Sequence, residues 1–405
     1  MSHHDAAMDK LTPPDPIRLP VLAKVAAAIA ALVGAGAFYW SLSSGHADVA
    51  WSSYLIGAFY ALSLGLFGVA WVAILYLSKG VWSVTMRRIP EAMSAWLLPG
   101  GVLAIGVALG SHHLYHWTDP KAVAADALLT YKQPFLNMGM FFGLVGASLL
   151  VWLVFSFLIM RNSRRQDQSG QVALSRTNVT LSAVFIVLFA LSFTVVSYYL
   201  LMSLEPHWFS TMYAVLTFTD LIQTGTAFVS LVAAGLIIGG KLKGFLNENH
   251  LHSVAKMMFA ATGFWAYIYF CQFLLIWYAN IPEETTHFIT RWENGWLIYL
   301  LVLPMLKFVV PFILLVPREN KRKPGRVAAM ALLILIAQFW ELYMLVAPAI
   351  GHGSHAAHGH VPIVEAAVTL GFLGLFFLVF AWALGRHNAV PLKDPRLREC
   401  LRYHQ

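Results

Sequence analysis

Ten apolar runs, each long enough to cross a bilayer as a helix, follow one another along this chain. A transmembrane helix needs about 20 mainly apolar residues. Barrel strands are excluded, because they alternate apolar and polar residues over segments of about ten residues, whereas several of these runs are continuous. The pattern predicts an all-α polytopic membrane protein with ten transmembrane helices, at 21–42, 52–77, 92–112, 135–160, 179–203, 210–239, 255–279, 295–316, 327–349 and 362–384.

Composition and cysteine usage narrow the class further. Of the 405 residues 59% are hydrophobic and only 11% are charged, whereas a soluble domain carries about 25% charged residues. Cys271 lies in a predicted span and Cys400 near the end of the chain, so the cysteines provide no framework for a disulfide, a zinc ion or an iron–sulfur cluster. We expect this chain to bind no metal or redox centre, and any such centre to belong to a partner.

Lysines and arginines are concentrated in alternate segments between the predicted spans. Of the 27, all but six lie in one set of segments, which includes the polar stretch 317–326. This asymmetry is typical of membrane topology and not of a nucleic-acid-binding face, and cytoplasmic loops carry the excess of positive charge. It predicts an N-terminal arm at 1–20 and a C-terminal tail at 385–405, both cytoplasmic, on either side of a membrane domain at 21–384.

Three ionisable residues lie well inside predicted spans. A charge there costs about 2.5–3.5 kcal/mol at the bilayer centre and usually marks a functional site. Asp220 is predicted near the midplane of the sixth span, and Glu341 in the outer half of the ninth. Lys307 is predicted toward the inner side of the eighth span, where its ammonium either bonds carbonyls freed by neighbouring prolines or extends to the cytoplasmic surface.

Titratable groups at successive depths suggest a route for protons. The candidate stations are Asp220, Lys307, Glu341 and His112, and the candidates to hold water between them are Thr217, Thr219, Gln338 and Tyr343. The alternative is that Asp220 and Lys307 form a buried salt bridge without a transport role.

Two histidine-rich segments are predicted on the outer surface. In SHHLYHW (111–117), His112 and His116 are four residues apart and share one face of a helix. Proton exchange, a hydrogen bond to a quinone carbonyl and haem ligation are possible roles, and histidine's titration near neutral pH favours the first two. In GHGSHAAHGH (351–360), a flexible tract without fixed ligand geometry, adventitious metal binding is favoured over a built metal site.

Several longer segments carry a resemblance to a known family. FWAYIYFCQFLLIWYANIPEET (264–285) resembles the ActF subunits of alternative complex III, which are NrfD/PsrC-like membrane subunits of a bacterial quinol:electron-acceptor oxidoreductase. The similarity extends to MRRIPEAMSAWLLPG (86–100), LYHWTDP (114–120), FLNMGMFF (135–142), SLEPHWFSTMYAV (203–215) and NENHLHSVAKMMFA (247–260).

The resemblance implies an architecture and a set of partners. Helices 2–5 and 6–9 would form two four-helix bundles, with helices 1 and 10 peripheral. The chain would lie in the bacterial inner membrane with a second NrfD-like subunit, ActC, and with subunits that carry c-type haems and iron–sulfur clusters. It would carry no redox centre itself and would contribute proton conduction, with quinol as the substrate of the complex.

Two other functions stay open from the sequence. One is a secondary transporter, since transporters favour helices broken near the membrane centre and Pro304 and Pro311 would break the eighth span. The other is a structural scaffold or second quinone-binding subunit for the haem and cluster proteins. Co-purification of c-type haem would argue against the transporter.

Overall fold

The computed structural model describes residues 14–293, 295–350 and 361–404 and contains ten helices or helix series long and apolar enough to cross a membrane. No strand occurs among these described residues, so the prediction of an all-α polytopic membrane protein is confirmed. The spans are α2 (Val21–Ser43), α3 (Ala47–Leu77), the series α4 (Arg88–Met93), α5 (Leu97–Ile105) and α6 (Ser111–Leu114), α9 (Met138–Ser169), α10 (Val172–Leu200), α11 (Tyr213–Ile238), α12 (Glu248–Ala279), the pair α14 (Leu297–Pro304) and α15 (Val310–Leu315), α17 (Pro324–Ile350) and α18 (Ile363–Leu384).

Several helices continue beyond the apolar runs. The fourth run was expected to end near residue 160, yet α9 reaches Ser169, and α10 begins at Val172 rather than 179. Gly170, with a φ of 71°, provides the left-handed residue that ends α9. An apolar run determines only the part of a helix that lies in the hydrocarbon core of the membrane. The packing of α9 against α10 stabilises both helices beyond that core, in the polar region.

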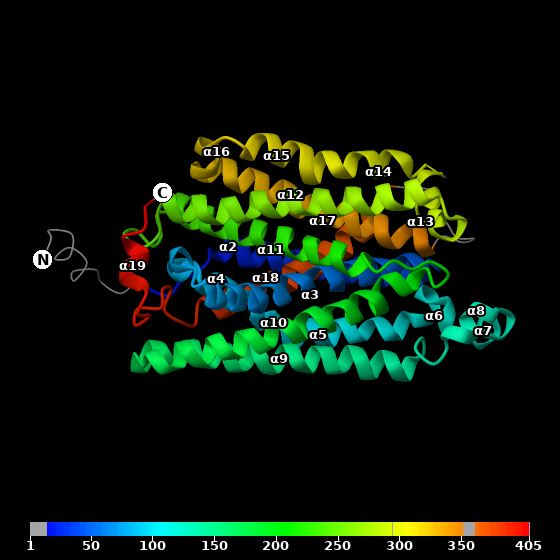
Figure 1. Ribbon diagram of the computed structural model, residues 1–405, viewed down its shortest axis with the longest axis horizontal. Helices are drawn as coiled ribbons and strands as arrows, with labels where there is room; N and C mark the ends of the chain where they lie inside the picture. The colour runs from blue at the N-terminus through cyan, green and yellow to red at the C-terminus, as the bar shows by residue number, and fades with distance from the viewer. Residues whose placement is uncertain (1–13, 294, 351–360, 405) are drawn as a thin grey trace, which may run out of the picture.

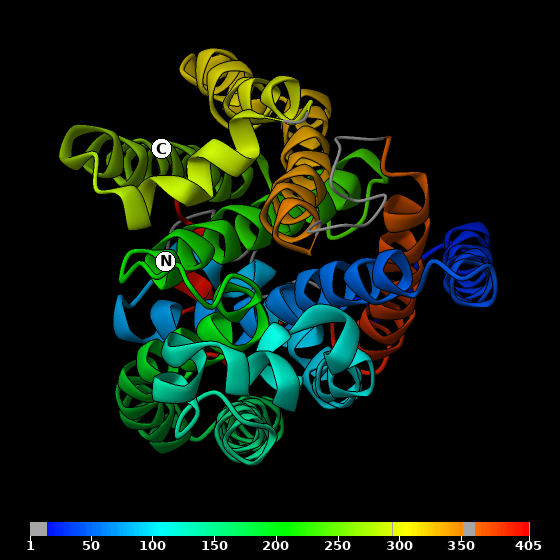
Figure 2. The same ribbon diagram turned by 90° about the vertical axis from the view of Figure 1, so that its right-hand side faces the viewer.

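The spans form two groups of packed helices, and α3 is the most buried helix of the first group. α3 is almost wholly buried and packs with α4, α5 and α10, while α9 packs on α5 and α10. In the second group α11 lies against α12 and α17, and α14 and α15 complete it. Figure 2 shows α2 at one edge, covering α18. α18 is less peripheral than predicted, because it lies between α2 and α3.

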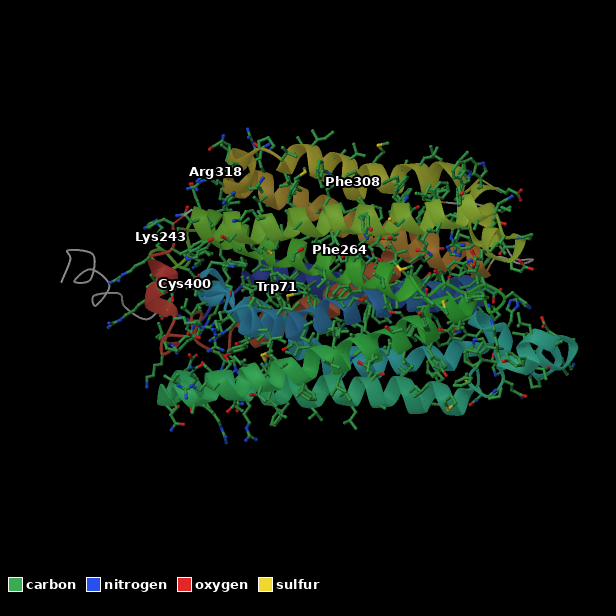
Figure 3. The ribbon with its side chains drawn as sticks, in the orientation of Figure 1. Trp71, Lys243, Phe264, Phe308, Arg318 and Cys400 are labelled. Atoms are coloured by element: carbon green, nitrogen blue, oxygen red, sulfur yellow. The ribbon has the colours of Figure 1, made fainter. Side chains whose placement is uncertain are left out.

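The two ends of the helices differ in charge. One end, called the basic end below, carries α16 (Arg318–Arg322), α19 (Leu397–Leu401) and the 239–247 loop. Figure 3 shows Lys243, Arg318 and Cys400 at this end. The other end, called the opposite end, carries α7 (Pro120–Ala125), α8 (Ala127–Lys132) and α13 (Pro282–Trp292). Both described ends of the chain lie at the basic end, as an even number of spans requires (Figure 1).

Candidate functional site

A lysine buried between three helices forms the centre of the candidate site. Lys307 has no exposed surface, and its Nζ donates hydrogen bonds to Asp220 Oδ1 of α11 and Glu341 Oε2 of α17. It also donates to Gln338 Oε1, 2.8 Å away. Asp220 is 3% exposed and Glu341 1%, so one ammonium and two carboxyl groups share a site from which solvent is excluded. We call these four residues the lysine cluster.

The irregular eighth span positions Lys307. The turn Met305–Val309 between α14 and α15 is a π-helix, a form that occurs mostly as single turns and frequently at functional sites. Pro311 has no N–H group, so the carbonyl of Lys307, four residues earlier, lacks its helical donor. Gln223 Nε2 of α11 donates to that carbonyl at 2.9 Å and thereby fixes the broken helix beside Asp220.

Aromatic and amide side chains complete the surroundings of the lysine cluster. Trp265 Nε1 of α12 donates to Glu341 Oε1 at 3.0 Å, and the Trp265 ring centroid lies 4.9 Å from Lys307 Nζ. Thr224 Oγ1 donates to Gln338 Oε1 at 2.9 Å. The second oxygen of Asp220, Oδ2, is buried and has no hydrogen-bond partner in the described part of the chain.

The prediction that Asp220, Lys307 and Glu341 lie at successive depths is wrong. Lys307 bonds both carboxyl groups, so all three lie at one depth, and it does not extend to the basic end. Counted from the opposite end, Asp220, Lys307 and Glu341 are each about 11–15 Å along their helices at 1.5 Å per residue. The alternative of a buried salt bridge between Asp220 and Lys307 describes the contact correctly, with Glu341 as a second partner.

The other predicted residues have partners outside the lysine cluster. Thr217 donates to Ser197 Oγ of α10 at 3.0 Å and to carbonyls of its own helix. Tyr343 is buried against Trp296, with ring centroids 5.3 Å apart. His112 and His116 are exposed at the opposite end, and His112 Nδ1 lies 3.4 Å from Thr118 Oγ1.

A second charged group, which the sequence analysis did not single out, lies at the opposite end. Arg291 Nη2 of α13 donates to Glu205 Oε1 at 2.7 Å, and His287 Nδ1 lies 2.8 Å from Glu205 Oε2. Trp208 stacks on the His287 ring with centroids 4.0 Å apart. Arg291 Nε also donates to the carbonyl of Met344 at 2.9 Å. We call Glu205, His287 and Arg291 the outer triad.

Charge and burial oppose each other in the outer triad. Burial favours the neutral form of Glu205, but the charges of Arg291 and His287 outweigh it and hold the pKa of that carboxyl below its usual value. Burial, together with Arg291, lowers the pKa of His287. Arg291 Nη1 lies 2.9 Å from His287 Nδ1 and donates to the His287 carbonyl at 2.8 Å, so Arg291 contacts both other members of the group.

A small cavity connects the outer triad with the lysine cluster. Its volume is about 30 Å³, enough for a water molecule. Gln272 Oε1 is buried without a hydrogen-bond partner in the described chain. Polar groups from four helices line the cavity: Tyr213, Tyr269, Gln272, His287, Arg291 and Glu341.

One sequence signal could have revealed the outer triad. His287 and Arg291 are four residues apart, and therefore share one face of the short polar helix α13. Both are buried although they lie outside the membrane spans, at 5% and 3% exposure. Their partner Glu205 is far away in sequence, and no local pattern indicates that pairing.

A third charged group lies at the basic end. Arg88 Nη1 donates to Glu91, and Arg87 Nε lies 3.4 Å from the same carboxyl. Arg88 also bonds Asp167 of α9, and Arg87 Nη1 donates to Asp394 of the C-terminal tail at 2.6 Å. These contacts attach the tail to the helix bundle.

The remaining sequence predictions lie elsewhere. The tract His352–His360 and the first thirteen residues of the N-terminal arm are outside the described residues. Within the described ranges, no group of three or more His, Cys, Asp or Glu side chains is placed to hold a metal ion. No protein-family model matches the chain, and no curated protein is significantly similar to it.

Proposed function

We propose that this chain is an ActF-like subunit of a quinol oxidoreductase of the alternative complex III type, in a bacterial inner membrane with both termini cytoplasmic. Its own contribution is proton exchange at the lysine cluster. The observation that carries this proposal is that a single buried lysine faces two buried carboxyl groups, from Asp220 and Glu341.

Charge balance makes this group suited to exchange a proton. With all three groups ionised, the site carries one negative charge in excess, and an uncompensated buried charge is strongly unfavourable. Binding of one proton by either carboxyl group makes the site neutral. Asp220 Oδ2, which lacks a hydrogen-bond partner in the described chain, is available to hold that proton. Both carboxyl groups bond Lys307, so a proton on either one balances the charge of the site.

The cavity supplies an outward connection for this proton. Glu341 and Gln272 both line it, and Arg291 and His287 line its other end. A water molecule there would have several polar partners, which is the condition for a stable buried water. The outer triad then separates the cavity from the surface at the opposite end.

The partners follow from the resemblance. ActC and the subunits with c-type haems and iron–sulfur clusters would oxidise quinol and carry its electrons. This chain would add the path by which protons move. The overall composition, with ten spans and short connections, suits a subunit embedded beside other membrane subunits.

Substitution of the two carboxyl groups tests the proposal. Asp220→Asn and Glu341→Gln keep side-chain shape but remove titration, and should lower proton release per quinol oxidised by the purified complex in proteoliposomes. Glu293→Gln, which removes an exposed carboxyl at the opposite end, is the matched control and should have no effect. If both cluster variants assemble normally and keep wild-type turnover and proton stoichiometry, the proton role is refuted.

One observation favours a secondary transporter as a second candidate. The π-helical turn beside Lys307 breaks the eighth span next to buried charges, as in transporters with discontinuous helices. Purification in mild detergent separates the two functions. Haem c absorbance in the same fraction supports the oxidoreductase subunit, whereas a haem-free stable monomer supports the transporter.

A further inference from the structure

A mainly polar cavity at the basic end lies outside the lysine cluster and the outer triad. Its volume is about 610 Å³, and its walls come from two segments far apart in sequence, 14–18 and 240–245. The first segment precedes α2 and is anchored by Ile17, which is buried in the main hydrophobic core. The second follows α11 and is anchored by Leu242 and Phe245, which are buried as well. Apolar side chains therefore hold both walls in place.

The backbone of the second wall alternates in handedness. The angle φ is 63° at Gly240, 55° at Leu242 and 85° at Gly244, whereas Lys241 and Lys243 between them are not left-handed. Successive N–H groups in such an alternating segment turn toward one side and form a nest, a concave surface that binds anions. Left-handed backbone at a leucine is uncommon, and such strain is often found where a segment has a function.

Three consecutive N–H groups of this loop have no acceptor. Lys241 N donates to the carbonyl of Leu236 at 2.8 Å, and this bond ends α11. The next N–H groups, those of Leu242, Lys243 and Gly244, donate to no group in the described part of the chain. Because backbone N–H groups are strong donors, these three are available to a ligand with several acceptor oxygens.

Three basic side chains line the same cavity. Lys241 and Lys243 come from the loop and Arg18 from the other wall, and Asp15 is the one acid among the described residues that line it. Lys243 folds back over the loop, because a Cβ atom built on Gly240 would lie 3.3 Å from its Cε and 3.8 Å from its Nζ. Positive charge is therefore in excess beside the free N–H groups. This combination suits a phosphate group, which presents several anionic oxygens.

The cavity lies at the level of phospholipid headgroups. Arg18 is three residues before the start of α2 at Val21, and Lys241 is three residues after the end of α11 at Ile238. Both lie just beyond the apolar part of these spans, in the polar layer of about 5–8 Å on each side of the hydrocarbon core. α2 lies at one edge of the molecule (Figure 2), and Val21 and Leu22 at its start are 75% and 79% exposed. Lipid at this edge therefore adjoins the cavity.

We propose that this cavity binds a phosphate group, held by the free N–H groups of the loop and by Lys241, Lys243 and Arg18. The group belongs either to the headgroup of an anionic phospholipid or to a soluble phosphate compound, and both present the same anionic oxygens. The site uses none of the groups of the proton proposal and is independent of it.

Calorimetric titration of the full chain in a non-ionic detergent tests the site. The probes are dioctanoyl phosphatidylglycerol and inorganic phosphate, and dioctanoylglycerol, which lacks a phosphate, is the control ligand. Tighter binding of phosphatidylglycerol assigns the site to a lipid headgroup, whereas equal or tighter binding of inorganic phosphate assigns it to a soluble compound. The proposal is overturned if neither phosphate probe shows saturable binding, or if dioctanoylglycerol binds as tightly as phosphatidylglycerol.

Charge variants test the location. Lys243→Gln and Arg18→Gln, from opposite walls, should each weaken binding about threefold to tenfold, as expected when one positive charge near an anion is removed. Asp15→Asn removes a repelling carboxylate and should instead tighten binding. Lys323→Gln, at the same end but outside the cavity, is the matched control and should leave binding unchanged.

All four side chains are exposed, so the variants should fold normally. Binding that Lys323→Gln weakens as much as Lys243→Gln would reflect the general charge of the basic end and would overturn the proposal. So would binding that neither Lys243→Gln nor Arg18→Gln weakens.

Discussion

Two prolines leave backbone carbonyls of α17 and of the eighth span free to accept hydrogen bonds from side chains of other helices. Pro311 leaves the carbonyl of Lys307 without its helical N–H, and Pro348 does the same for Met344. Gln223 donates to the first carbonyl and Arg291 to the second, both at 2.9 Å. The carbonyl of Lys307 therefore belongs to a residue of the lysine cluster, and the carbonyl of Met344 accepts a hydrogen bond from the outer triad.

The role of Gln223 can be tested together with Pro311. Gln223→Leu leaves the Lys307 carbonyl buried and unpaired, which should cost about 1–3 kcal/mol of stability. The midpoint of thermal unfolding in detergent measures the loss. Pro311→Ala restores the N–H group, so the double variant should regain part of the lost stability. A double variant that is less stable than Gln223→Leu alone would contradict this account.

At the scale of elements, α13 folds back onto the helices although it is polar. Pro282 provides its first residue, and His287 and Arg291 turn the same face toward Glu205. The carbonyls at the end of α17 complete the attachment, through Met344 and Leu345 at 2.9 Å each. Charge pairing therefore helps to hold this element, together with the packing of Phe288 against Phe273, whose ring centroids are 5.3 Å apart.

Acid should loosen α13. Burial and Arg291 lower the pKa of His287 from 6.5, and despite burial the charges of Arg291 and His287 hold the pKa of Glu205 below 4.5. Both folded-state values lie below the unfolded ones, so the unfolded state binds protons more tightly and stability falls as pH decreases, first below about 6.5. Backbone hydrogen exchange in α13, corrected for its intrinsic pH dependence, should show protection falling between pH 7 and pH 5.

His287→Phe is the control for this pH effect. It keeps an aromatic ring against Trp208 and removes the first titration, so protection should change little until the pH falls below about 4.5, where the unfolded-state carboxyl of Glu205 begins to bind protons. An unchanged acid response above pH 5 in this variant would assign the effect to another group.

The contact between α2 and α18 depends on glycine at one position and not at its neighbour. A side chain at Gly34 would meet the backbone of Gly371, whereas one at Gly36 would meet no atom within 4 Å. Gly34→Val should therefore destabilise the protein by about 1–3 kcal/mol, as overpacking does. Gly36→Val is the matched control and should be near neutral. The measurement is thermal unfolding in the same detergent, and equal effects of the two variants would argue against this contact.

At the scale of the whole molecule, the separation of charge between the two ends predicts orientation. The basic end carries both described chain ends and the 317–326 stretch, so we expect it in the cytoplasm. An alkaline phosphatase fused after Gln405 should be inactive, because this enzyme needs the periplasm. The same enzyme inserted between Asp126 and Ala127, at the α7–α8 junction, should be active. The reverse pattern would place the basic end in the periplasm and contradict this orientation.

The sequence alone determined the fold class, the spans and the charges inside them. Hydrophobicity is a local property, so the run that includes Lys307 identifies both a helix and a buried charge without knowledge of its neighbours. The pairing of Glu91 with Arg87 and Arg88 was equally accessible, because residues three and four apart meet on a helix.

Only the tertiary structure decided which groups meet. The depth of Lys307 depends on where α14 begins and on the π-helical turn that directs its side chain between α11 and α17. Glu205 and Arg291 are 86 positions apart in sequence, and only helix packing and the return of α13 bring them together. Side chains far apart in sequence meet through the packing of whole helices, so no local pattern specifies the lysine cluster or the outer triad.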